Sequence, residues 1–283
     1  MAAPEAGTNR PLSDAQRRHY ATRGYVSPLT AFAPEQAARY RARLEAMERS
    51  AGGISHDRAR KLHLYLSWVD EIVRDPRILD AVEDLIGPDI LVYHLTLWLK
   101  EPRSDARISW HQDATYFGLA PPDLHVTAWV ALTASDAASG CVQVVPGSHR
   151  DGPRRHEVGA LPGNMFRTGQ QIDIGPDAQL DSLVLQPGQF SLHHTWLHHA
   201  SMPNRSDDRR IGLGISYIPT HCICTARQRL SAMLVRGSDR HGHFDAEVSP
   251  RHDLEPAALE RHADAVSRWH AAREQLIAEA HAR

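Results

Sequence analysis

The order of helical and strand-like patterns most restricts the fold that this chain can adopt. Residues 1–88 carry helical patterns, of which 35–49 is the clearest, with apolar residues recurring on one face. From 89 to 220 the pattern changes to short runs rich in Val, Ile, Leu, Thr and Trp, beginning with 90–99. Because strands and helices do not alternate, a parallel nucleotide-binding sheet is disfavoured. A β-sandwich or jelly roll with flanking helices is predicted instead.

The 283 residues are predicted to form one domain, since no linker or internal repeat divides them. Segment 150–180 is long and rich in Gly, Pro and polar residues, which predicts a lid loop. Segment 255–283 is rich in Ala, Glu and Arg and predicts a C-terminal helix, whereas 1–11 predicts a loose tail rather than a signal peptide. The remaining expected elements in the N-terminal part are helices over 13–20 and 77–86, a brief strand at Tyr25 and Val26, and a helical or irregular stretch over 56–75.

The charge balance and the cysteine count limit the partners and the compartment. The formal net charge is -2 and the isoelectric point is near 6.8, so no basic field exists to hold nucleic acid or an anionic membrane. No run approaches the roughly 18 apolar residues that a membrane span needs. Three cysteines do not make a disulfide framework and favour a reducing cytoplasm. The sequence specifies no oligomeric state.

The pair His111 and Asp113 is the first candidate for chemistry. On a strand, residues i and i+2 point to the same face, so a strand ending here would aim an imidazole and a carboxylate at one point. Two His and one carboxylate with open positions form the facial triad of non-haem Fe(II) oxygenases. A His-x-Asp pair is common by chance, so this interpretation needs a second His from a later strand.

Four histidines between Gln189 and Asn204 offer that second ligand. Side chains alternate between the two faces of a strand. If this stretch were one unbroken strand, His193 and His199 would lie on one face, and His194 and His198 on the opposite face. A few residues later Arg209 and Arg210 lead into an apolar strand, where one guanidinium projecting into a cavity would clasp a carboxylate with two parallel hydrogen bonds.

These motifs in this order resemble the phytanoyl-CoA dioxygenase family over about residues 15–220. The resemblance rests on His111-Gln112-Asp113, the 140–150 segment Gly-Cys-Val-Gln-Val-Val-Pro-Gly-Ser-His-Arg, Pro-Gly-Gln-Phe, and the His-Ala-Ser-x-Pro-Asn-x-Ser that begins at His199. Proteins of this family are Fe(II)- and 2-oxoglutarate-dependent oxygenases with a double-stranded β-helix core. The resemblance therefore implies Fe(II), 2-oxoglutarate as co-substrate and O2.

The resemblance also assigns residues. The family's metal ligands fall on His111, Asp113 and His199, since its distal His stands directly before a small residue and Ser. Its 2-oxoglutarate arginine lies eleven residues beyond that His, on Arg210. Further positions that the family implies near the cofactor are Ser201, Gln112, Trp129 and Thr96.

The implied reaction is hydroxylation or another oxidation of an unactivated C–H bond in a small molecule. Related halogenases carry a small residue where Asp113 stands, which leaves room for chloride, so halogenation is disfavoured here. The Ala- and Arg-rich composition mildly favours a role in secondary metabolism. Candidate substrate contacts are Tyr116, Phe117, Trp98 and residues of 56–68 and 150–180, while Arg227 and Arg229 are expected to lie on a solvated face.

Two other functions remain open on the sequence. The same fold would serve a non-catalytic protein that binds a metal or another ligand. A zinc-dependent hydrolase would use the same His-x-Asp and distal His with a bound water, but it needs a general base and no Glu stands next to these residues.

Overall fold

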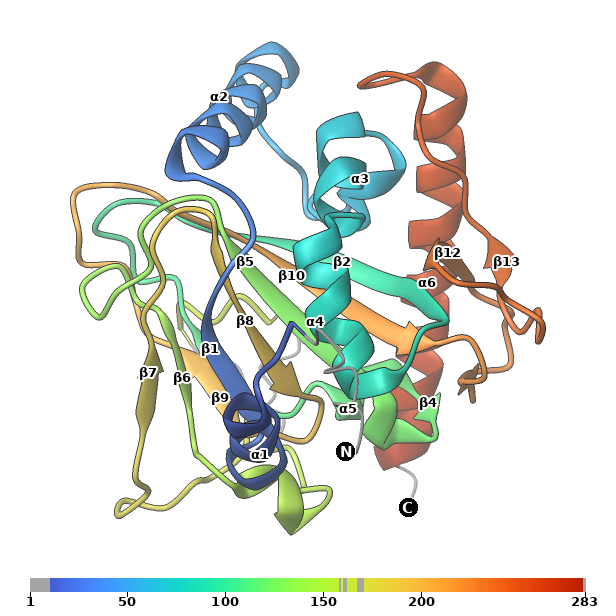
Figure 1. Ribbon diagram of the computed structural model, residues 1–283. Coiled ribbons are helices and arrows are strands. Elements are labelled where there is room, and N and C mark those ends of the chain that lie inside the picture. The colour runs from blue at the N-terminus through green and yellow to red at the C-terminus, as the bar shows by residue number, and fades with distance from the viewer. Residues whose placement is uncertain (1–10, 158, 160–161, 167–170, 282–283) are drawn as a thin grey trace, which may run out of the picture.

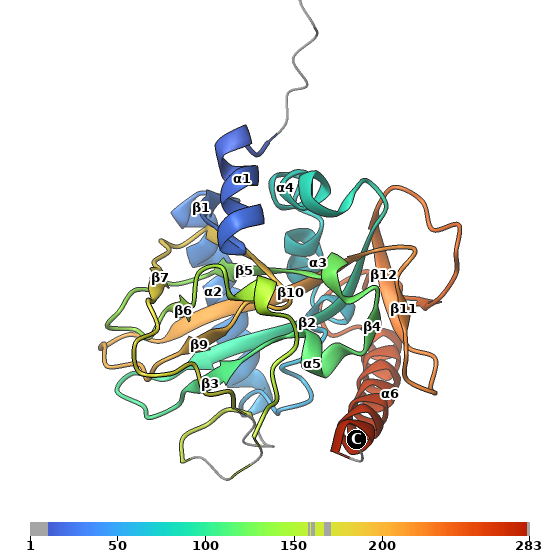
Figure 2. The same cartoon turned by 90° about the horizontal axis from the view of Figure 1, so that it is seen from below.

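Two main β-sheets and a set of flanking helices make up the computed structural model, which describes residues 11–157, 159, 162–166 and 171–281. The seven-stranded sheet has the order β1 (Tyr25–Thr30), β8 (Gln189–His194), β5 (Val126–Ala131), β10 (Arg210–Pro219), β2 (Ile90–Lys100), β12 (Ser231–Arg236) and β13 (Asp245–Ala246). The four-stranded sheet has the order β3 (Ile108–His111), β9 (His199–Ser201), β6 (Val142–Val144) and β7 (Asp181–Leu183). A two-stranded ribbon joins β11 (Ile223–Cys224) and β4 (Leu119–Ala120). Figures 1 and 2 show this arrangement from two sides.

The helices follow the sequence expectations closely. They are α1 (Asp14–Arg23), α2 (Pro34–Ala51), α3 (Ser67–Val73), α4 (Pro76–Ile86), α5 (Ala114–Phe117) and α6 (Pro256–His281), with 3-10 turns at Leu62–Leu64, Pro122–Leu124 and Ser148–Asp151. Ser13 caps α1 by accepting from the Gln16 N–H, and Gln16 closes a capping box in return. Gly52 ends α2 in the left-handed conformation with φ 69°, which costs glycine nothing. Of the tail expected over residues 1–11, residues 1–10 lie outside the described residues.

The mainly β fold with flanking helices, predicted from the order of patterns, is confirmed, but the large sheet extends beyond 89–220. Strand β1 comes from the N-terminal part and pairs with β8, while β12 pairs with β2 after the last predicted strand. The brief strand that the sequence predicts at Tyr25 and Val26 is confirmed and extends to Thr30. Strand β12 has three buried residues followed by three less buried ones, so it lacks the clear alternation that identifies a strand in a sequence. No helix in the described ranges is long and apolar enough to cross a membrane.

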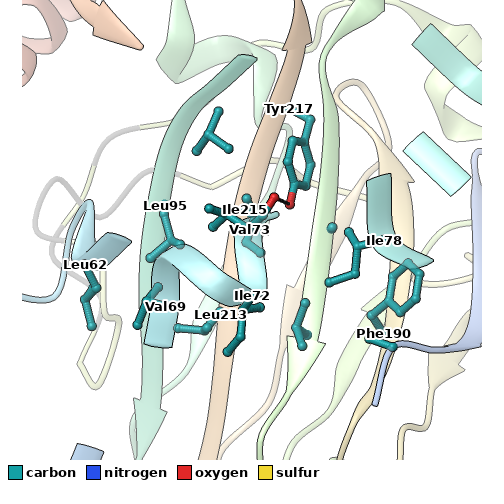
Figure 3. Close-up of a cluster of buried hydrophobic side chains, with 14 of the residues drawn as sticks. Leu62, Val69, Ile72, Val73, Ile78, Leu95, Phe190, Leu213, Ile215 and Tyr217 are labelled. Carbon is teal, nitrogen blue, oxygen red and sulfur yellow. Dashed lines mark hydrogen bonds between the residues drawn. The ribbon is translucent and has the colours of Figure 1, made fainter. Parts of the chain in front are cut away.

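Helices α3 and α4 cover one face of the large sheet and form the main hydrophobic core with it. Leu95 of β2 and Leu213 and Ile215 of β10 meet Ile72 and Val73 of α3, and all five are at most 1% exposed (Figure 3). Burying side chains of this size contributes roughly 1.5–3 kcal/mol each. This packed face fixes the large sheet as the rigid support for whatever lies on its other face.

The opposite face of the large sheet looks toward the four-stranded sheet, and two tryptophans cover it. Strand β10 has glycine at 212 and 214, where a Cβ atom would lie 2.1 Å from the Trp129 ring and 2.8 Å from Trp98 Nε1. Side chains at these positions would therefore displace both indoles. The two glycines let Trp129 of β5 and Trp98 of β2 lie over β10, and the candidate site is built on this surface.

Candidate metal centre

Main-chain pairing in the small sheet brings two of the predicted residues together. Strand β3 pairs with β9 so that His111 stands opposite His199. The sequence expectation that Asp113 shares a strand face with His111 is wrong in its detail, because β3 ends at His111 and Asp113 is already helical, with φ -60° and ψ -41°. The turn into α5, rather than the strand pleat, carries the carboxylate back toward the imidazole.

The side chains of His111, Asp113 and His199 converge on one point. Asp113 Oδ1 lies 3.6 Å from His111 Nε2 and 3.7 Å from His199 Nε2. The Nδ1 atom of His111 contacts the Ser109 carbonyl at 2.8 Å, and that of His199 contacts the Leu197 carbonyl at 2.9 Å. A carbonyl only accepts hydrogen bonds, so both neutral rings carry the proton on Nδ1 and turn the Nε2 lone pair toward the carboxylate.

The chemistry of this donor set fits a divalent transition metal. Two imidazole nitrogens and one carboxylate oxygen, all within 4.8 Å of one another, are the set expected for non-haem iron. Burial lowers the pKa of His199 well below its usual range, and the neighbouring His111 adds to this effect. A neutral imidazole is the form that binds a metal.

Two residues that the sequence interpretation did not assign hold the far side of the carboxylate. Thr127 Oγ1 donates a hydrogen bond to Asp113 Oδ2 at 2.7 Å, and His193 Nε2 lies 3.4 Å from the same oxygen. These contacts leave Oδ1 for the side that faces the two Nε2 atoms. The expected unbroken strand from His193 to His199 is also wrong, because β8 ends at His194 and a turn separates it from β9.

Arg210 lies in the same cavity and is 1% exposed. Its Nη1 donates to the Gly140 carbonyl at 2.7 Å and to Ser201 Oγ at 2.9 Å, and its guanidinium lies 4.8 Å from the centre of the Trp129 ring. Lys100, its partner in the β10–β2 register, is also buried and donates to the Ser201 carbonyl at 3.0 Å.

Neither of these two buried cations has a carboxylate partner among the described residues. The ion pairs that involve Lys and Arg in this part of the chain include neither Lys100 nor Arg210. Burial and the charge of Arg210 lower the pKa of Lys100 to about 6, and burial lowers that of Arg210 to about 10. Burial is the main cause of both shifts, and no acidic side chain among the described residues opposes it.

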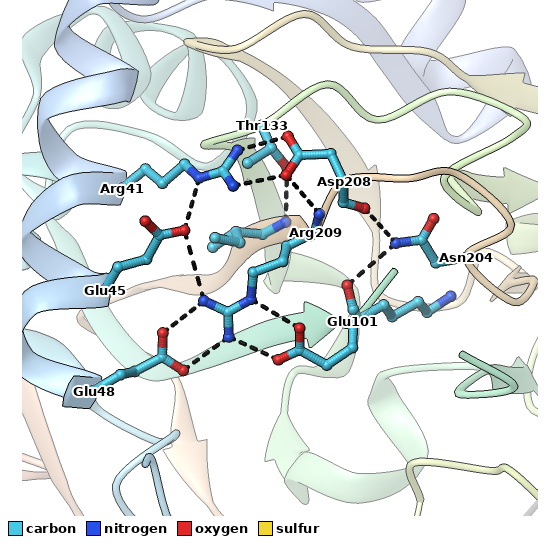
Figure 4. Close-up of polar contacts among 10 residues, drawn as sticks. Arg41, Glu45, Glu48, Glu101, Thr133, Asn204, Asp208 and Arg209 are labelled. Atoms are coloured by element: carbon cyan, nitrogen blue, oxygen red, sulfur yellow. Dashed lines mark hydrogen bonds and ion pairs between the residues drawn. The ribbon is translucent and has the colours of Figure 1, made fainter. Parts of the chain in front are cut away.

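Arg209, the neighbouring candidate, points away from the cavity. Its guanidinium contacts Glu48 at 2.7 Å and Glu101 at 2.8 Å, in a network that also reaches Asp208 and Arg41 (Figure 4). Its charge is thus already balanced at the surface. Neighbouring side chains point to opposite sides of the chain here, so Arg210 rather than Arg209 points into the cavity. The spacing of the family motif predicts the same choice.

Two adjoining cavities meet at the candidate centre. The first cavity, of about 420 Å³, is lined by Trp98, Ile108, His111, Asp113, Thr127, Trp129, Val142, His193, His199, Ala200, Ser201 and Arg210. The second cavity, of about 570 Å³, is lined by His56, Arg60, His94, Thr96, Trp98, His111, Asp113, Phe117, Met165, Phe166, Trp269 and Arg273. His111, Asp113 and Trp98 belong to both, so the candidate metal position stands between them.

The remaining sequence-predicted residues divide between these cavities. Ser201 and Trp129 line the first cavity, whereas Thr96 lines the second. Gln112 lines neither: its side-chain amide donates to the Gly152 and Trp196 carbonyls and its oxygen accepts from the Arg154 N–H, so it braces the chain behind the centre.

Several predicted substrate contacts also line the second cavity. They are Trp98, Phe117, His56 and Arg60 of 56–68, and Met165 and Phe166 of 150–180. The Tyr116 side chain lies outside what the structure describes. Arg227 and Arg229 are exposed and pair with Glu279 and Asp245, as expected for a solvated face. The sequence interpretation missed His94, Trp269 and Arg273, the last two because nothing in a sequence predicts where α6 packs.

The fold and the donor set define a class: a double-stranded β-helix protein with a candidate centre of two His and one carboxylate. Comparison with known proteins agrees. The sequence matches the family model described as phytanoyl-CoA dioxygenase (PhyH) over residues 20–212, and the chain belongs to this family.

Three known proteins illustrate what the chain is similar to. The chain is similar to the apo structure of the non-heme monooxygenase ThoJ, at 35% identity and a TM-score of 0.81, covering 93% of this chain and 98% of that one. It is 32% identical to the peroxisomal phytanoyl-CoA dioxygenase of Rattus norvegicus, over 52% of this chain and 45% of the relative. It is 30% identical to the 1-deoxypentalenic acid 11-beta-hydroxylase of Streptomyces arenae, over 49% of this chain and 52% of the relative. The chain thus spans about half the length of these two curated relatives.

Proposed function

We propose that this protein is an Fe(II)- and 2-oxoglutarate-dependent dioxygenase that hydroxylates, or otherwise oxidises, an unactivated C–H bond of a small molecule. One observation carries the proposal. Arg210 is buried without a carboxylate partner among the described residues, in the same cavity as His111, Asp113 and His199. A metal site alone would not need this cation, whereas a dicarboxylate co-substrate that binds metal at one end needs both.

In this proposal His111, Asp113 and His199 are the metal ligands, through Nε2, Oδ1 and Nε2. Thr127 and His193 hold the second carboxylate oxygen, which keeps Asp113 oriented toward the metal. When bound, Fe(II) together with 2-oxoglutarate and O2 supplies an oxidant able to remove hydrogen from an unreactive C–H bond, at the expense of converting 2-oxoglutarate to succinate and CO2. Three protein ligands leave positions for the co-substrate and O2.

Arg210 would receive the far carboxylate of 2-oxoglutarate in the first cavity. Ser201 stands beside it, and its hydroxyl accepts from Lys100 Nζ and donates to the Gly140 carbonyl, so the hydroxyl is fixed before the anion arrives. The Trp129 ring under the guanidinium limits its movement. A carboxylate bound to Arg210 would leave the other end of the co-substrate in the same cavity as the three proposed metal ligands.

The zinc hydrolase has less support than the oxygenase. It requires a general base beside the metal-bound water. Among the described residues that line the two cavities, Asp113 is the one acidic side chain, and it is a proposed ligand. A non-catalytic binding protein would keep the metal and the anion site but not the turnover of 2-oxoglutarate.

An anaerobic titration tests the proposal. Fe(II) and then 2-oxoglutarate are added to the metal-free protein, and the visible absorption spectrum is recorded. A weak charge-transfer band is expected in the wild type and not in His199→Ala. Admission of O2 should then yield succinate, measured by NMR; no band and no succinate would exclude the oxygenase, and a band without succinate at any substrate would favour the binding protein.

We further propose that the whole chain works as one oxygenase domain in the cytoplasm, on a substrate from secondary metabolism. The similarity to the Streptomyces arenae hydroxylase supports the last point. Three free cysteines support a reducing compartment.

A further inference from the structure

The second cavity holds a buried imidazole whose hydrogen-bonding atoms are not used. His94 of β2 is 3% exposed, and neither of its ring nitrogens has a hydrogen-bond partner among the described residues. Its ring is stacked on Trp269 of α6, with centroids 4.1 Å apart and an interplanar angle of 15°. A buried polar group without a partner destabilises a protein, so such a group in a cavity indicates that a ligand completes it.

The position of His94 on β2 directs it toward the candidate centre. Residues 94, 96 and 98 alternate along the strand and all line the second cavity, as do the proposed ligands His111 and Asp113. Phe166 closes the cavity near the centre, with its ring 4.6 Å from that of His111. A molecule in the second cavity would therefore contact His94 and the metal site together.

Two arginines lie beside Trp269 in the second cavity and give this wall a positive charge. The guanidinium carbons of Arg60 and Arg273 lie 5.6 Å and 5.8 Å from the centre of the Trp269 ring. The Arg60 head is fixed by its bonds to the His56 carbonyl at 2.6 Å and to the His56 ring at 2.8 Å. Among the described lining residues the one acidic side chain is Asp113, whose charge a bound metal would offset.

The part of this wall that α6 supplies lies outside the residues that match the family model, whereas Arg60 lies within them. Trp269 and Arg273 are four residues apart on α6 and so share a helix face, and both lie beyond residue 212, where the family match ends. Figure 2 shows α6 running beside α5 and β4, next to the end of β2. The remaining surface is apolar, with Trp98, Phe117, Met165 and Phe166.

We propose that the second cavity binds an anionic small molecule with an apolar body, whose anionic group is held by Arg60 and Arg273 and whose polar atoms satisfy His94. The proposal rests on the proposed function, because it makes this molecule the substrate. It names the substrate class as carboxylates, or phosphates, of apolar molecules, because the cavity wall combines two arginines with aromatic and apolar side chains. An uncharged terpene-like or peptide-amide substrate is thereby disfavoured.

The test compares three probes of one shape: naphthoate, naphthyl phosphate and the uncharged naphthamide. Each is titrated by calorimetry into the anaerobic protein loaded with Fe(II) and 2-oxoglutarate. We expect naphthoate or naphthyl phosphate to bind at least about tenfold more tightly than naphthamide, as charge-assisted bonds to arginine imply. The tighter of the two anions identifies which anionic group the substrate carries.

Single substitutions test the contributions of Arg273 and His94 to anion binding separately. Arg273→Gln should weaken binding of the preferred anion by about tenfold or more and leave naphthamide unchanged, while Arg227→Gln, a surface arginine near α6, is the matched control and should change neither. His94→Phe should weaken anion binding by about tenfold yet keep the thermal midpoint of the ligand-free protein at or above that of the wild type, because it removes unsatisfied polar atoms.

Each outcome decides the proposal. Equal binding of naphthamide and the anions, no binding of either anion, or an Arg273→Gln variant that binds like the wild type would overturn it. The charge-transfer band recorded in the same samples distinguishes this failure from that of the proposed function: a band without anion preference removes the substrate class alone, whereas loss of the band removes the oxygenase itself.

Discussion

Replacing Arg210 by Met should separate the anion site from the stability of the fold. Two charge-assisted hydrogen bonds from a buried guanidinium to a carboxylate contribute roughly 3–5 kcal/mol together. At 1.4 kcal/mol per tenfold change, the dissociation constant of 2-oxoglutarate should rise by about two to three orders of magnitude. The metal-free protein, however, loses a buried cation that has no carboxylate partner among the described residues. Its free energy of unfolding should therefore stay unchanged or rise by up to ~3 kcal/mol.

The assay is an anaerobic titration of 2-oxoglutarate into the Fe(II)-loaded variant, followed by the charge-transfer band, together with urea unfolding of the metal-free protein. The band should keep its wavelength at saturation, because chelation takes place at the opposite end of the co-substrate. Arg209→Met is the matched control: it breaks the pairs with Glu45, Glu48 and Glu101 outside the cavity and should keep wild-type affinity for 2-oxoglutarate. A threefold or smaller change in Arg210→Met, or a large one in Arg209→Met, would refute the assignment.

Two further predictions concern the support of the site and the acid stability of the fold. Gly212→Ala should raise the dissociation constant of 2-oxoglutarate at least about tenfold in the same titration. The new methyl group would meet the Trp129 ring at 2.1 Å and push the indole into the first cavity. Unaltered affinity would show that the indole has room to move. Glu247 is buried against Lys61 at 2.5 Å and His63 at 3.1 Å, and although burial raises its pKa, these neighbours lower it further, to about 2. A lowered pKa stabilises the fold above the unfolded value near 4.5, and this contribution is lost as the pH falls toward 2. Glu247→Gln should cost about 3–5 kcal/mol at pH 7 and flatten the pH dependence of urea unfolding between pH 4.5 and 3; a parallel pH dependence in both proteins would contradict this.

Much of the fold follows from local rules that a sequence displays. Ser13 and Gly52 mark helix ends because capping is a matter of neighbouring residues. Strand β2 is evident because it is rich in Leu and in the β-branched and aromatic residues Ile, Val, Thr, Tyr and Trp. Helical patterns followed by strand-like patterns are compatible with few architectures, and the structure has the predicted one, β-sheets flanked by helices.

The site was predictable where a motif fixes it and not where distant elements meet. The sequence points to His111 and Asp113 as a pair, but strand geometry is the wrong reason, since a turn brings them together. The sequence also groups His193 with His199, and their rings do lie 4.6 Å apart in the first cavity, but a turn between β8 and β9 brings them together rather than the alternation of one unbroken strand. The stacking of α6 against His94 depends on tertiary packing over a long stretch of chain, which no local pattern records.

The most direct test of the account is a diffraction experiment on anaerobic crystals grown with Fe(II) and 2-oxoglutarate, using the anomalous signal of iron. We expect one anomalous iron peak within bonding distance of His111 Nε2, Asp113 Oδ1 and His199 Nε2. The far carboxylate of 2-oxoglutarate should lie on Arg210. A metal that also takes His193 as a fourth protein ligand, or one bound instead at the surface group His56, Asp57 and His270, would contradict it.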